Sequence, residues 1–492
     1  MRRAPYRSAR AELVEALCFV VRKAKAALRQ AQGERLWGAA ALLVIAAPVA
    51  AETIAITNGT VALGDGSEPI PGGTVLIRDG RIVAAGGMQF KLPADTQVID
   101  ATGKWVTPGI VAGFSRLGLS EVDLGVEGSS DTSANGPFSA AIDVVPSINP
   151  LNSTISVNRA DGVTRAIVAP ATGRSIFAGQ GAVIDTGADM DPITAARRFQ
   201  FVELGESGAD TAGGSRSSAY ALFRNALREA GQLSRYMPPV QGGRTGQPDQ
   251  RDVPVIRDPN ESRAENARRN EDVLLTRFDA AALVPVLQGR QYLLVHVERA
   301  SDILNVLGLK REFPRLKLVL VGASEGWTVA EQIARAGVAV IASPVNDLPA
   351  SFEQLAATQS NVGRMLGAGV RVSIGTIDDN DTRNLFAERQ YAGNLVALQK
   401  VPGATGVRWG EALALITSRP AEAVGMGGEL GSLAKGRRAD VVIWSGDPLE
   451  GTSAVEQVYI DGVRQPLATR QSKLLERYRY LPRRELPEAY RH

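Results

Sequence analysis

The sequence predicts an α/β protein with a parallel sheet in its middle and a small β-domain built from both ends. Over the middle of the 492-residue chain, strand-like apolar runs alternate with helical segments. This alternation indicates a parallel sheet, either a closed eight-fold barrel or an open doubly wound sheet. Hydrophobic residues at 44% and charged residues at 22% are typical of a folded protein and exclude global disorder.

The first fifty residues carry a pattern that is separate from the fold. Residues 36–51 are LWGAAALLVIAAPVAA, an apolar run that follows Arg35 and ends in small side chains. This pattern predicts a secretory signal peptide cleaved after Ala51, and therefore a periplasmic or secreted protein. The run is too short to span a bilayer comfortably, so we expect no stable membrane insertion after cleavage. The alternative is a buried amino-terminal helix.

Removal of residues 1–51 changes the charge of the chain. The whole chain has a net charge of +3, and this leader holds nine basic and three acidic residues, so the remainder carries −3. The single cysteine, Cys18, leaves with the leader, and one cysteine excludes both a disulfide framework and a cysteine-based zinc site. An acidic, exported chain is not expected to bind nucleic acid. Residues 1–35 are long for the charged part of a signal, and we expect translation to begin nearer Leu36.

Two β-rich stretches lie on either side of the predicted parallel sheet. The predicted strands are 54–63, 98–99, 105–106 and 439–444, and the predicted hairpins are 73–86 and 456–464. Asp79-Gly80 and Asp461-Gly462 are typical of the tight turns of such hairpins. The simplest account pairs the two stretches in one small β-domain.

The middle of the chain supplies the strands and helices of the parallel sheet. The clearest strands are 165–168, 292–297, 316–320, 338–341 and 370–374, and the clearest helices are 301–307, 328–336, 352–366 and 409–417. Residues 205–272 interrupt the alternation and are expected to form an insertion with one helix and a mobile loop. An amphipathic helix at 467–480 is expected to pack its Leu and Tyr face on the body.

Three segments carry a family resemblance. Residues 106–119 are VTPGIVAGFSRLGL, residues 148–185 contain the run GVTRAIVAPATGRSIFAGQGAVID, and residues 412–450 are ALALITSRPAEAVGMGGELGSLAKGRRADVVIWSGDPLE. They resemble, respectively, the opening, the second and third barrel units, and the closing signature of the amidohydrolase superfamily, in its imidazolonepropionase-like branch. The match extends in order over nearly all of residues 54–465.

The resemblance implies a (β/α)8 TIM-like barrel joined to a small split β-sandwich. The implied boundaries are 52–108 and 420–466 for the two parts of the sandwich, 109–419 for the barrel, and 467–492 for a carboxyl-terminal helix and tail. It also implies a hydrolase of carbon–nitrogen bonds other than peptide bonds, with a small-molecule substrate and divalent Zn or Mn. Assembly with itself or with another amidohydrolase is an open alternative.

The metal ligands that the resemblance implies are mostly missing. Active relatives hold paired cations with His-x-His after strand one, a bridging carboxylated Lys or acid after strand four, one His after each of strands five and six, and an Asp after strand eight. Phe114 and Arg116 stand at the first pair and Gly322 at the sixth-strand position. Phe has no donor atom, and Arg is a cation without an acceptor. The standard binuclear site is therefore expected to be degraded.

The strand-four position is also altered. No Lys occurs between Lys104 and Lys310, so a carboxylated lysine is excluded there, and Asp185 or Glu203 is the substitute to consider. His296 fits the fifth-strand position, where it is either a metal ligand or a hydrogen-bonded core histidine.

The eighth strand is followed by acids that are one or two places out of register. Ile377 stands at the position of the family's Asp, and Asp378, Asp379 and Asp381 follow. Asp378 is a candidate catalytic base, with or without a metal, and these acids are either oxygen ligands for Ca²⁺, Mg²⁺ or Mn²⁺ or a solvated loop. We expect Arg116 either to pair with these acids in place of the lost metals or to bind a substrate carboxylate.

Two functions of different class follow from these residues. The first is an exported amidohydrolase-family hydrolase with a degraded, mononuclear or metal-free site. The second is a catalytically inactive barrel that binds or supports an active homologue. Barrel architecture alone does not separate them, because one fold hosts many functions.

Overall fold

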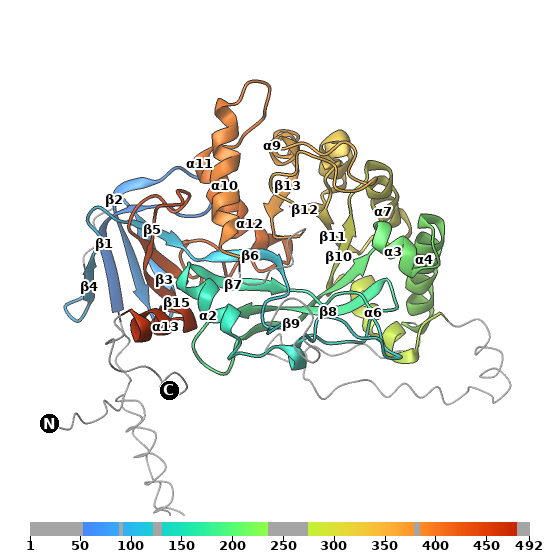
Figure 1. Ribbon diagram of the computed structural model, residues 1–492, viewed down its shortest axis with the longest axis horizontal. Coiled ribbons are helices and arrows are strands. Elements are labelled where there is room, and N and C mark those ends of the chain that lie inside the picture. Colours follow the sequence, from blue (N-terminus) through green and yellow to red (C-terminus); the bar gives the residue numbers. More distant parts are fainter. Residues whose placement is uncertain (1–52, 88–91, 122–129, 235–273, 378–383, 480–492) are drawn as a thin grey trace, which may run out of the picture. The chain divides into compact units, whose positions relative to one another are not determined.

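The computed structural model describes residues 53–87, 92–121, 130–234, 274–377 and 384–479 (Figure 1). The chain divides into two units, Met1–Ala51 and Glu52–His492. The first unit holds the predicted signal peptide and lies outside the described residues, so the description below concerns the second unit. Among the described residues, no helix is long and apolar enough to cross a membrane.

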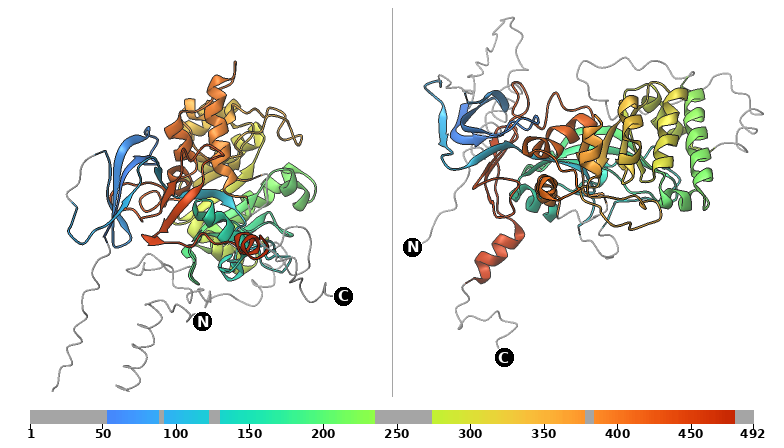
Figure 2. Two further views of the ribbon diagram at one scale, coloured as in Figure 1. Left: turned by 60° about the vertical axis from the view of Figure 1, so that its left-hand side comes forward. Right: turned by 90° about the horizontal axis from the view of Figure 1, so that it is seen from above.

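Both ends of this second unit meet in one eight-stranded sheet, as the sequence predicts. Its strands are β1 (Thr53–Val61), β2 (Ile70–Arg78), β3 (Arg81–Gly86), β4 (Gln97–Asp100), β5 (Trp105–Pro108), β14 (Val441–Trp444), β15 (Val455–Ile460) and β16 (Val463–Arg464). The order is β16-β15-β14-β5-β1-β2-β3, with β4 paired to β1. The antiparallel pairing of β5 with β14 joins the two parts, and Figure 2 shows these blue and red strands lying together. The two predicted hairpin turns are present. All four of their central residues, in Asp79-Gly80 and Asp461-Gly462, have the positive φ that such turns require.

The second sheet is a nearly closed barrel of eight strands. These are β6 (Ile110–Ser115), β7 (Val163–Val168), β8 (Phe177–Asp185), β9 (Ile193–Glu203), β10 (Tyr292–Val297), β11 (Lys317–Gly322), β12 (Ala339–Ala342) and β13 (Arg371–Ile374). They follow the chain order, with β6 and β13 as the two edges. The TIM-like barrel that the sequence predicts is therefore confirmed.

One strand of the barrel runs against the expectation of a fully parallel sheet. β8 is antiparallel to both β7 and β9. The links at residues 169–176 and 186–192 contain no helix. A parallel neighbour needs a crossover of a dozen or more residues, so links this short return the chain in the opposite direction.

The seam between β6 and β13 is held by a close backbone approach and one side chain. A Cβ atom on Gly113 would lie 2.2 Å from the carbonyl oxygen of Ile374, so only glycine fits this point. The amide of Gly113 donates to Glu388 Oε1 at 3.3 Å, and the backbone amide of Thr376 also bonds this carboxyl. Burial raises the pKa of Glu388 well above its usual value. The Glu388 carboxyl thus bridges the two edge strands.

Helices cover the outside of the barrel (Figure 1). They are α2 (Ser153–Ala160), α3 (Glu206–Thr211), α4 (Arg216–Leu233), α6 (Arg277–Leu287), α7 (Ala300–Glu312), α8 (Ala330–Ala336), α9 (Asn361–Gly367), α10 (Ala387–Ala397), α11 (Trp409–Leu415), α12 (Ser418–Ala423) and α13 (Arg470–Tyr478), with short 3₁₀ turns at Val145–Ser147, Gly326–Val329 and Leu398–Lys400. The helix predicted at 352–366 is wrong in its first half, because only Asn361–Gly367 is helical there. Residues 352–360 instead form turns beside the mouth of the barrel.

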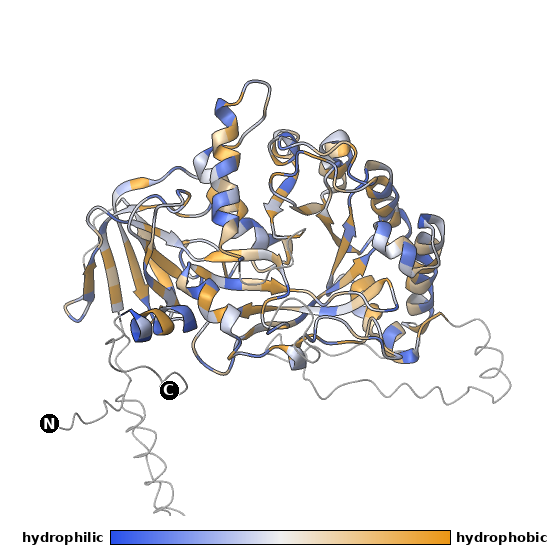
Figure 3. Cartoon of the chain, in the orientation of Figure 1, coloured by the Kyte–Doolittle hydropathy of each residue, from blue (hydrophilic) through white to orange (hydrophobic). Residues whose placement is uncertain are grey.

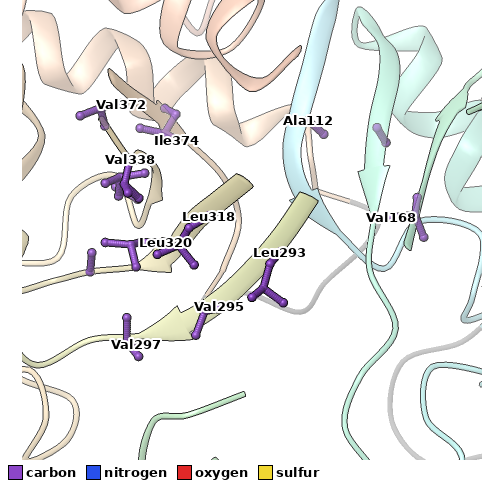
Figure 4. Packing of buried hydrophobic residues seen from close by; sticks show 14 of the residues in the cluster. Ala112, Val168, Leu293, Val295, Val297, Leu318, Leu320, Val338, Val372 and Ile374 are labelled. Atoms are coloured by element: carbon purple, nitrogen blue, oxygen red, sulfur yellow. The ribbon is translucent and has the colours of Figure 1, made fainter. Parts of the chain in front are cut away.

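Alternate residues of the barrel strands separate two hydrophobic cores. Leu293, Val295 and Val297 of β10 belong to the layer between strands and helices, which Figure 4 shows together with residues of β11 and β13. Leu294 lies in the barrel interior with Phe114. Val424, which directly follows α12, belongs to the same hydrophobic cluster. Figure 3 shows the same division as hydrophobic strands beneath outer helices with hydrophilic segments, such as α4.

The two remaining expectations concern the insertion and the carboxyl-terminal helix. Within 205–272, helices α3 and α4 are present, whereas the loop predicted as mobile falls on residues outside the described part. The helix expected at 467–480 forms as α13, but its packing was predicted wrongly. Leu474, Leu475 and Tyr478 are 42%, 65% and 46% exposed, so its apolar face does not rest on the body.

Candidate functional site

The candidate site lies where the parallel barrel strands end. Arg116 follows β6, Glu203 ends β9, His296 is the fifth residue of β10, and Gly322 ends β11. Strands β9, β10 and β11 pair side by side, with His296 opposite Glu203 in the β9–β10 register, whereas β6 pairs with β7. In barrels of this kind the carboxyl ends of the strands carry the site, because loops from several strands converge there.

An aromatic layer in the barrel interior supports Arg116. The rings of Phe114 and Phe201 have centroids 5.1 Å apart. The guanidinium carbon of Arg116 lies 5.0 Å from the first centroid and 5.5 Å from the second. Because the faces of aromatic rings attract cations, these contacts hold the charge of Arg116 above the hydrophobic interior.

Arg116 is a half-buried cation with little compensation among the described residues. Its Nη1 donates to the carbonyl oxygen of Ala169 at 2.7 Å. Burial lowers its pKa to about 10, although the negative charge of Glu203 favours the charged form. No carboxylate of the described residues accepts a hydrogen bond from Arg116. The ion pair expected with Asp378 or Asp379 stays a prediction, because both acids lie outside the described residues.

His296 lies between two carboxylates. Its Nδ1 is 2.7 Å from Glu203 Oε1, and its Nε2 is 2.9 Å from Glu298 Oε1. Burial alone would lower the pKa of His296, but the charge of Glu203 and the hydrogen bonds to Glu203 and Glu298 outweigh burial and raise the pKa well above 6.5. With both ring nitrogens facing carboxylates, the imidazole is held as an imidazolium that donates two hydrogen bonds.

Glu298 fills the space of the sixth-strand side chain. A Cβ atom on Gly322 would lie 2.1 Å from Glu298 Oε1, and Gly322 has a φ of +88°. The side chain of Glu298 is 1% exposed, and its Oε2 accepts a hydrogen bond from the amide of Ser324 at 2.7 Å. The carboxylate therefore occupies the place where the family pattern has a histidine. The sequence offered a signal for this residue, because Glu298 follows His296 by two positions.

A further carboxylate, Glu353, comes from the turns after β12. Its Oε2 accepts from the amide of Glu206 at 2.7 Å and from Arg216 Nη2 at 3.1 Å. Burial raises the pKa of Glu353, and the charge of His296 acts in the opposite direction. A Cβ atom on Gly205 would meet both Glu353 and Glu203, which places the two carboxylates near each other beside that backbone. Sequence reasoning missed Glu353, because it assigned this segment to a helix.

Asp185, the other substitute considered for strand four, lies elsewhere. It ends the antiparallel strand β8 and therefore lies at the amino-terminal end of the barrel, 3.3 Å from Arg165 Nη1. Glu203 is the acid that stands at the strand-four position of the site. The reversal of β8 is the reason that the sequence alone did not separate them.

The residues present do not fit a pair of metal ions. Phe114 offers no donor atom and Arg116 places a positive charge beside the first-strand position. Gly322 offers no ligand, and Glu298 fills the space around it. Within the described ranges, no three His, Cys, Asp or Glu side chains are arranged to hold a metal ion. His296 is bonded to carboxylates through both of its ring nitrogens.

The arrangement has chemical capacity of another kind. An imidazolium can donate a proton to a leaving nitrogen, and a guanidinium can stabilise an oxygen that becomes negative. Arg116 and His296 together place two organic cations among the carboxylates Glu203 and Glu298.

The sheet order, the split β-domain and the position of the site define a barrel protein of the amidohydrolase type. A family model described as the amidohydrolase family matches residues 317–465. Amidohydrolase tasK of Hapsidospora irregularis is 26% identical over 428 residues, which are 80% of this chain and 40% of that protein. The chain thus spans about two fifths of the length of that relative.

Two further similarities extend over most of both chains. Imidazolonepropionase of Acidiphilium cryptum is 24% identical over 418 residues, which are 80% of this chain and 94% of that protein. The crystal structure of an amidohydrolase from Thermotoga maritima superposes with a TM-score of 0.67 at 23% identity, over 84% of this chain and 99% of that chain. These similarities identify the chain as a member of the amidohydrolase superfamily and a distant homologue of imidazolonepropionase.

Proposed function

We propose that this protein is an exported hydrolase that acts on a carbon–nitrogen bond, other than a peptide bond, of a small molecule without the family's pair of metal ions. The observation that carries the proposal is the replacement of the metal site by side chains: Arg116 stands at the first-strand position, and Glu298 fills the space beside Gly322. The superfamily membership supplies the reaction class, and the side chains supply the departure from it.

The chemistry of the site follows from three groups. Asp378 is the predicted base that takes a proton from water as the water oxygen adds to the carbon of the C–N bond. The guanidinium of Arg116 stabilises the negative charge that develops on the substrate oxygen. The imidazolium of His296 gives a proton to the leaving nitrogen as the C–N bond breaks, and Glu203 and Glu298 hold its ring in place.

Export is supported by the position of the folded unit. That unit begins at Glu52, one residue after the predicted cleavage point, and β1 begins at Thr53. Amino-terminal sequencing of protein purified from the periplasm or the medium checks this part of the proposal. A mature chain that begins at Glu52 is expected, and a chain that keeps residues 36–51 in the cytoplasm would contradict it.

A second function, an inactive barrel that binds or supports an active homologue, is favoured by one observation. Both ring nitrogens of His296 are occupied by carboxylates, so a substrate has to displace one of them before it receives a proton. Under this second function the same network only replaces the structural role of the lost metals.

Metal analysis and turnover assays test the proposal together. The purified chain, assayed with cyclic amides, imidazolones and ureas, is expected to show turnover that survives chelators, with less than stoichiometric Zn or Mn. His296→Ala is expected to lose about 10²–10⁴-fold in kcat, the usual contribution of a general acid. Stoichiometric metal that disappears in His296→Ala would refute the metal-free site. A complete lack of turnover, with an active homologue co-purified from the native host, would favour the second function.

A further inference from the structure

A cleft lies outside the barrel between α4 and α7, away from the interior site. It encloses about 490 Å³, and Leu204 and Val297 form its floor at the ends of β9 and β10. This volume is in the range of small-molecule sites. Figure 1 shows α4 beside α7 on the flank of the barrel that is opposite the β-domain.

Arginines dominate the lining of this cleft. Four of them, Arg216, Arg224, Arg228 and Arg299, line it, together with one acid, Asp302. A cleft lined by one sign of charge concentrates the opposite charge. An anionic ligand is therefore the class that this lining favours.

The ion pairs of the arginines leave several N–H groups without a protein acceptor. Arg224 and Arg228 both use Nε to bond Glu312, at 2.6 and 2.5 Å, and two guanidinium groups thus share one carboxylate. Arg228 Nη1 also donates to Asn225 at 3.2 Å. The structure gives no acceptor among the described residues for the Nη atoms of Arg224 or for Nη2 of Arg228.

Arg299 and Arg216 differ in how fully they are engaged. Arg299 donates from Nη2 to Asp302 at 3.2 Å, and the structure gives no acceptor among the described residues for its Nη1. Arg216 is committed to Asp302 and Glu353, at 2.9 and 3.1 Å. Three arginines thus have donors available for a ligand, and the fourth connects the wall of the cleft to Glu353 at the barrel mouth.

We propose that this cleft binds a small molecule that carries a phosphoryl group on an apolar body. Guanidinium groups suit phosphate because their forked donors match its oxygens, and Arg224, Arg228 and Arg299 supply those donors. The apolar body of the ligand lies on the floor formed by Leu204 and Val297, beside Tyr220 and Val306. This proposal does not depend on the reaction at the barrel mouth.

Calorimetric titration of the full-length exported chain tests the proposal with three probes: phenyl phosphate, inorganic phosphate and benzyl alcohol. Phenyl phosphate is expected to bind most tightly, inorganic phosphate more weakly, and benzyl alcohol not at all. Equal affinity for the first two probes would overturn the apolar part of the proposal. Phosphoryl binding that does not weaken as salt rises, or no binding of either anion at 10 mM, would overturn the whole.

Two variants with opposite expected effects on affinity distinguish a binding role of the arginines from a purely structural one. Arg224→Gln is expected to weaken phenyl phosphate binding about tenfold, as loss of a charged hydrogen-bond donor does. Glu312→Gln removes the carboxylate that Arg224 and Arg228 share, and it is expected to tighten binding several-fold. A merely structural pair would weaken binding in both variants, which would overturn the proposal.

A matched control keeps the result specific to the cleft. Arg408 lies at the start of α11, forms an ion pair with Glu411 at 3.2 Å and has a side chain 71% exposed. Arg408→Gln is expected to leave phosphate binding unchanged. An equal loss in this variant would show nonspecific attraction to the surface and would overturn the proposal.

Discussion

The two ends of the barrel each hold an arginine, buried at one end and half-buried at the other, and the two arginines have opposite surroundings. At the amino-terminal end, Arg165 is fully buried and bonds Asp440 through Nε and Nη2, at 2.8 and 3.0 Å. It also contacts Asp185 at 3.3 Å and Asp461 at 2.9 Å. At the carboxyl end, Arg116 bonds one carbonyl oxygen among the described residues, that of Ala169, and lies against two aromatic rings.

The pKa values of the two arginines show what the difference means. Burial alone would lower the pKa of Arg165, but Asp440 and the other two acids outweigh burial and raise the pKa. Burial lowers the pKa of Arg116 to about 10, because only the more distant charge of Glu203 compensates for it. The first arginine is saturated and holds the barrel to the β-domain, whereas the second keeps donors available at the end where substrates of barrel enzymes bind.

The largest expected effect is at the saturated end. Arg165→Met leaves the buried Asp440 and two further acids without their cation, and it is expected to lower the free energy of unfolding by about 3–5 kcal/mol. Arg116→Met removes a cation that makes one hydrogen bond, and it is expected to cost about 1 kcal/mol or less. Urea unfolding followed by circular dichroism measures both. Equal losses in the two variants would break the comparison.

The next effect concerns the replacement of a metal ligand by Glu298. Gly322→Ala brings a Cβ atom against Glu298 and strains a left-handed backbone, so it is expected to cost about 2–4 kcal/mol. In a Glu298→Ala background only the backbone strain remains, and the cost is expected to fall to about 1–2 kcal/mol. A double-mutant cycle measures this coupling. Strictly additive costs would show that the two residues do not share the space.

The pH dependence of stability separates the two ends. His296 has a folded-state pKa raised above 6.5, so its stabilisation is complete below about pH 6.5 and is lost as the pH rises through the raised value. Burial raises the pKa of Asp185 to about 6 from 3.8, so its contribution is lost as the pH rises between these two values. The free energy of unfolding is measured across pH for His296→Asn and Asp185→Asn. Each variant is expected to lose the pH dependence that its own residue contributes.

NMR of the imidazole groups gives an independent check on the raised pKa of His296. The chain has two histidines, and comparison with His296→Asn assigns the His296 signal. That signal is expected to stay in the protonated form through neutral pH. A midpoint at or below 6.5 would contradict the arrangement of His296 between Glu203 and Glu298.

The smallest expected effect is at the seam, which lies at neither charged network. Burial raises the pKa of Glu388 and so favours its neutral form, which Gln resembles in shape, so Glu388→Gln is expected to change stability by about 0.5 kcal/mol or less. Glu388→Ala leaves the amide of Gly113 without its acceptor and is expected to cost about 1–3 kcal/mol. Urea unfolding distinguishes the pair, and a large loss in Glu388→Gln would show that the carboxyl is ionised.

The sequence predicts the fold where patterns are local. Asp79-Gly80 specifies its hairpin turn, and the apolar run of β10 gives its bounds, because each depends on neighbours a few residues away. The direction of β8 was missed because apolar alternation does not distinguish parallel from antiparallel strands. The helix expected over 352–360 was wrong because Glu353 is held by tertiary bonds to Glu206 and Arg216.

The sequence predicts which family positions of the candidate site are substituted, but it does not predict which side chains fill the space. The family pattern predicts Phe114, Arg116 and Gly322 as substitutions and His296 as a survivor, since each is one position in a known order, but it leaves Asp185 and Glu203 as alternatives. The compensation by Glu298 depends on the distance between one side chain and a backbone point on the next strand. Such a distance is fixed by the register of β10 against β11, which residue types alone do not specify.

The split sheet makes the order of synthesis important for this protein. β5 ends at Pro108, and its partner β14 begins at Val441, so the carboxyl-terminal partner strand is made last. At about 5–20 residues per second, the edge of β5 stays open for tens of seconds. An open edge is a template for pairing with other chains. A chain truncated anywhere before residue 441 therefore keeps the edge of β5 without its partner strand.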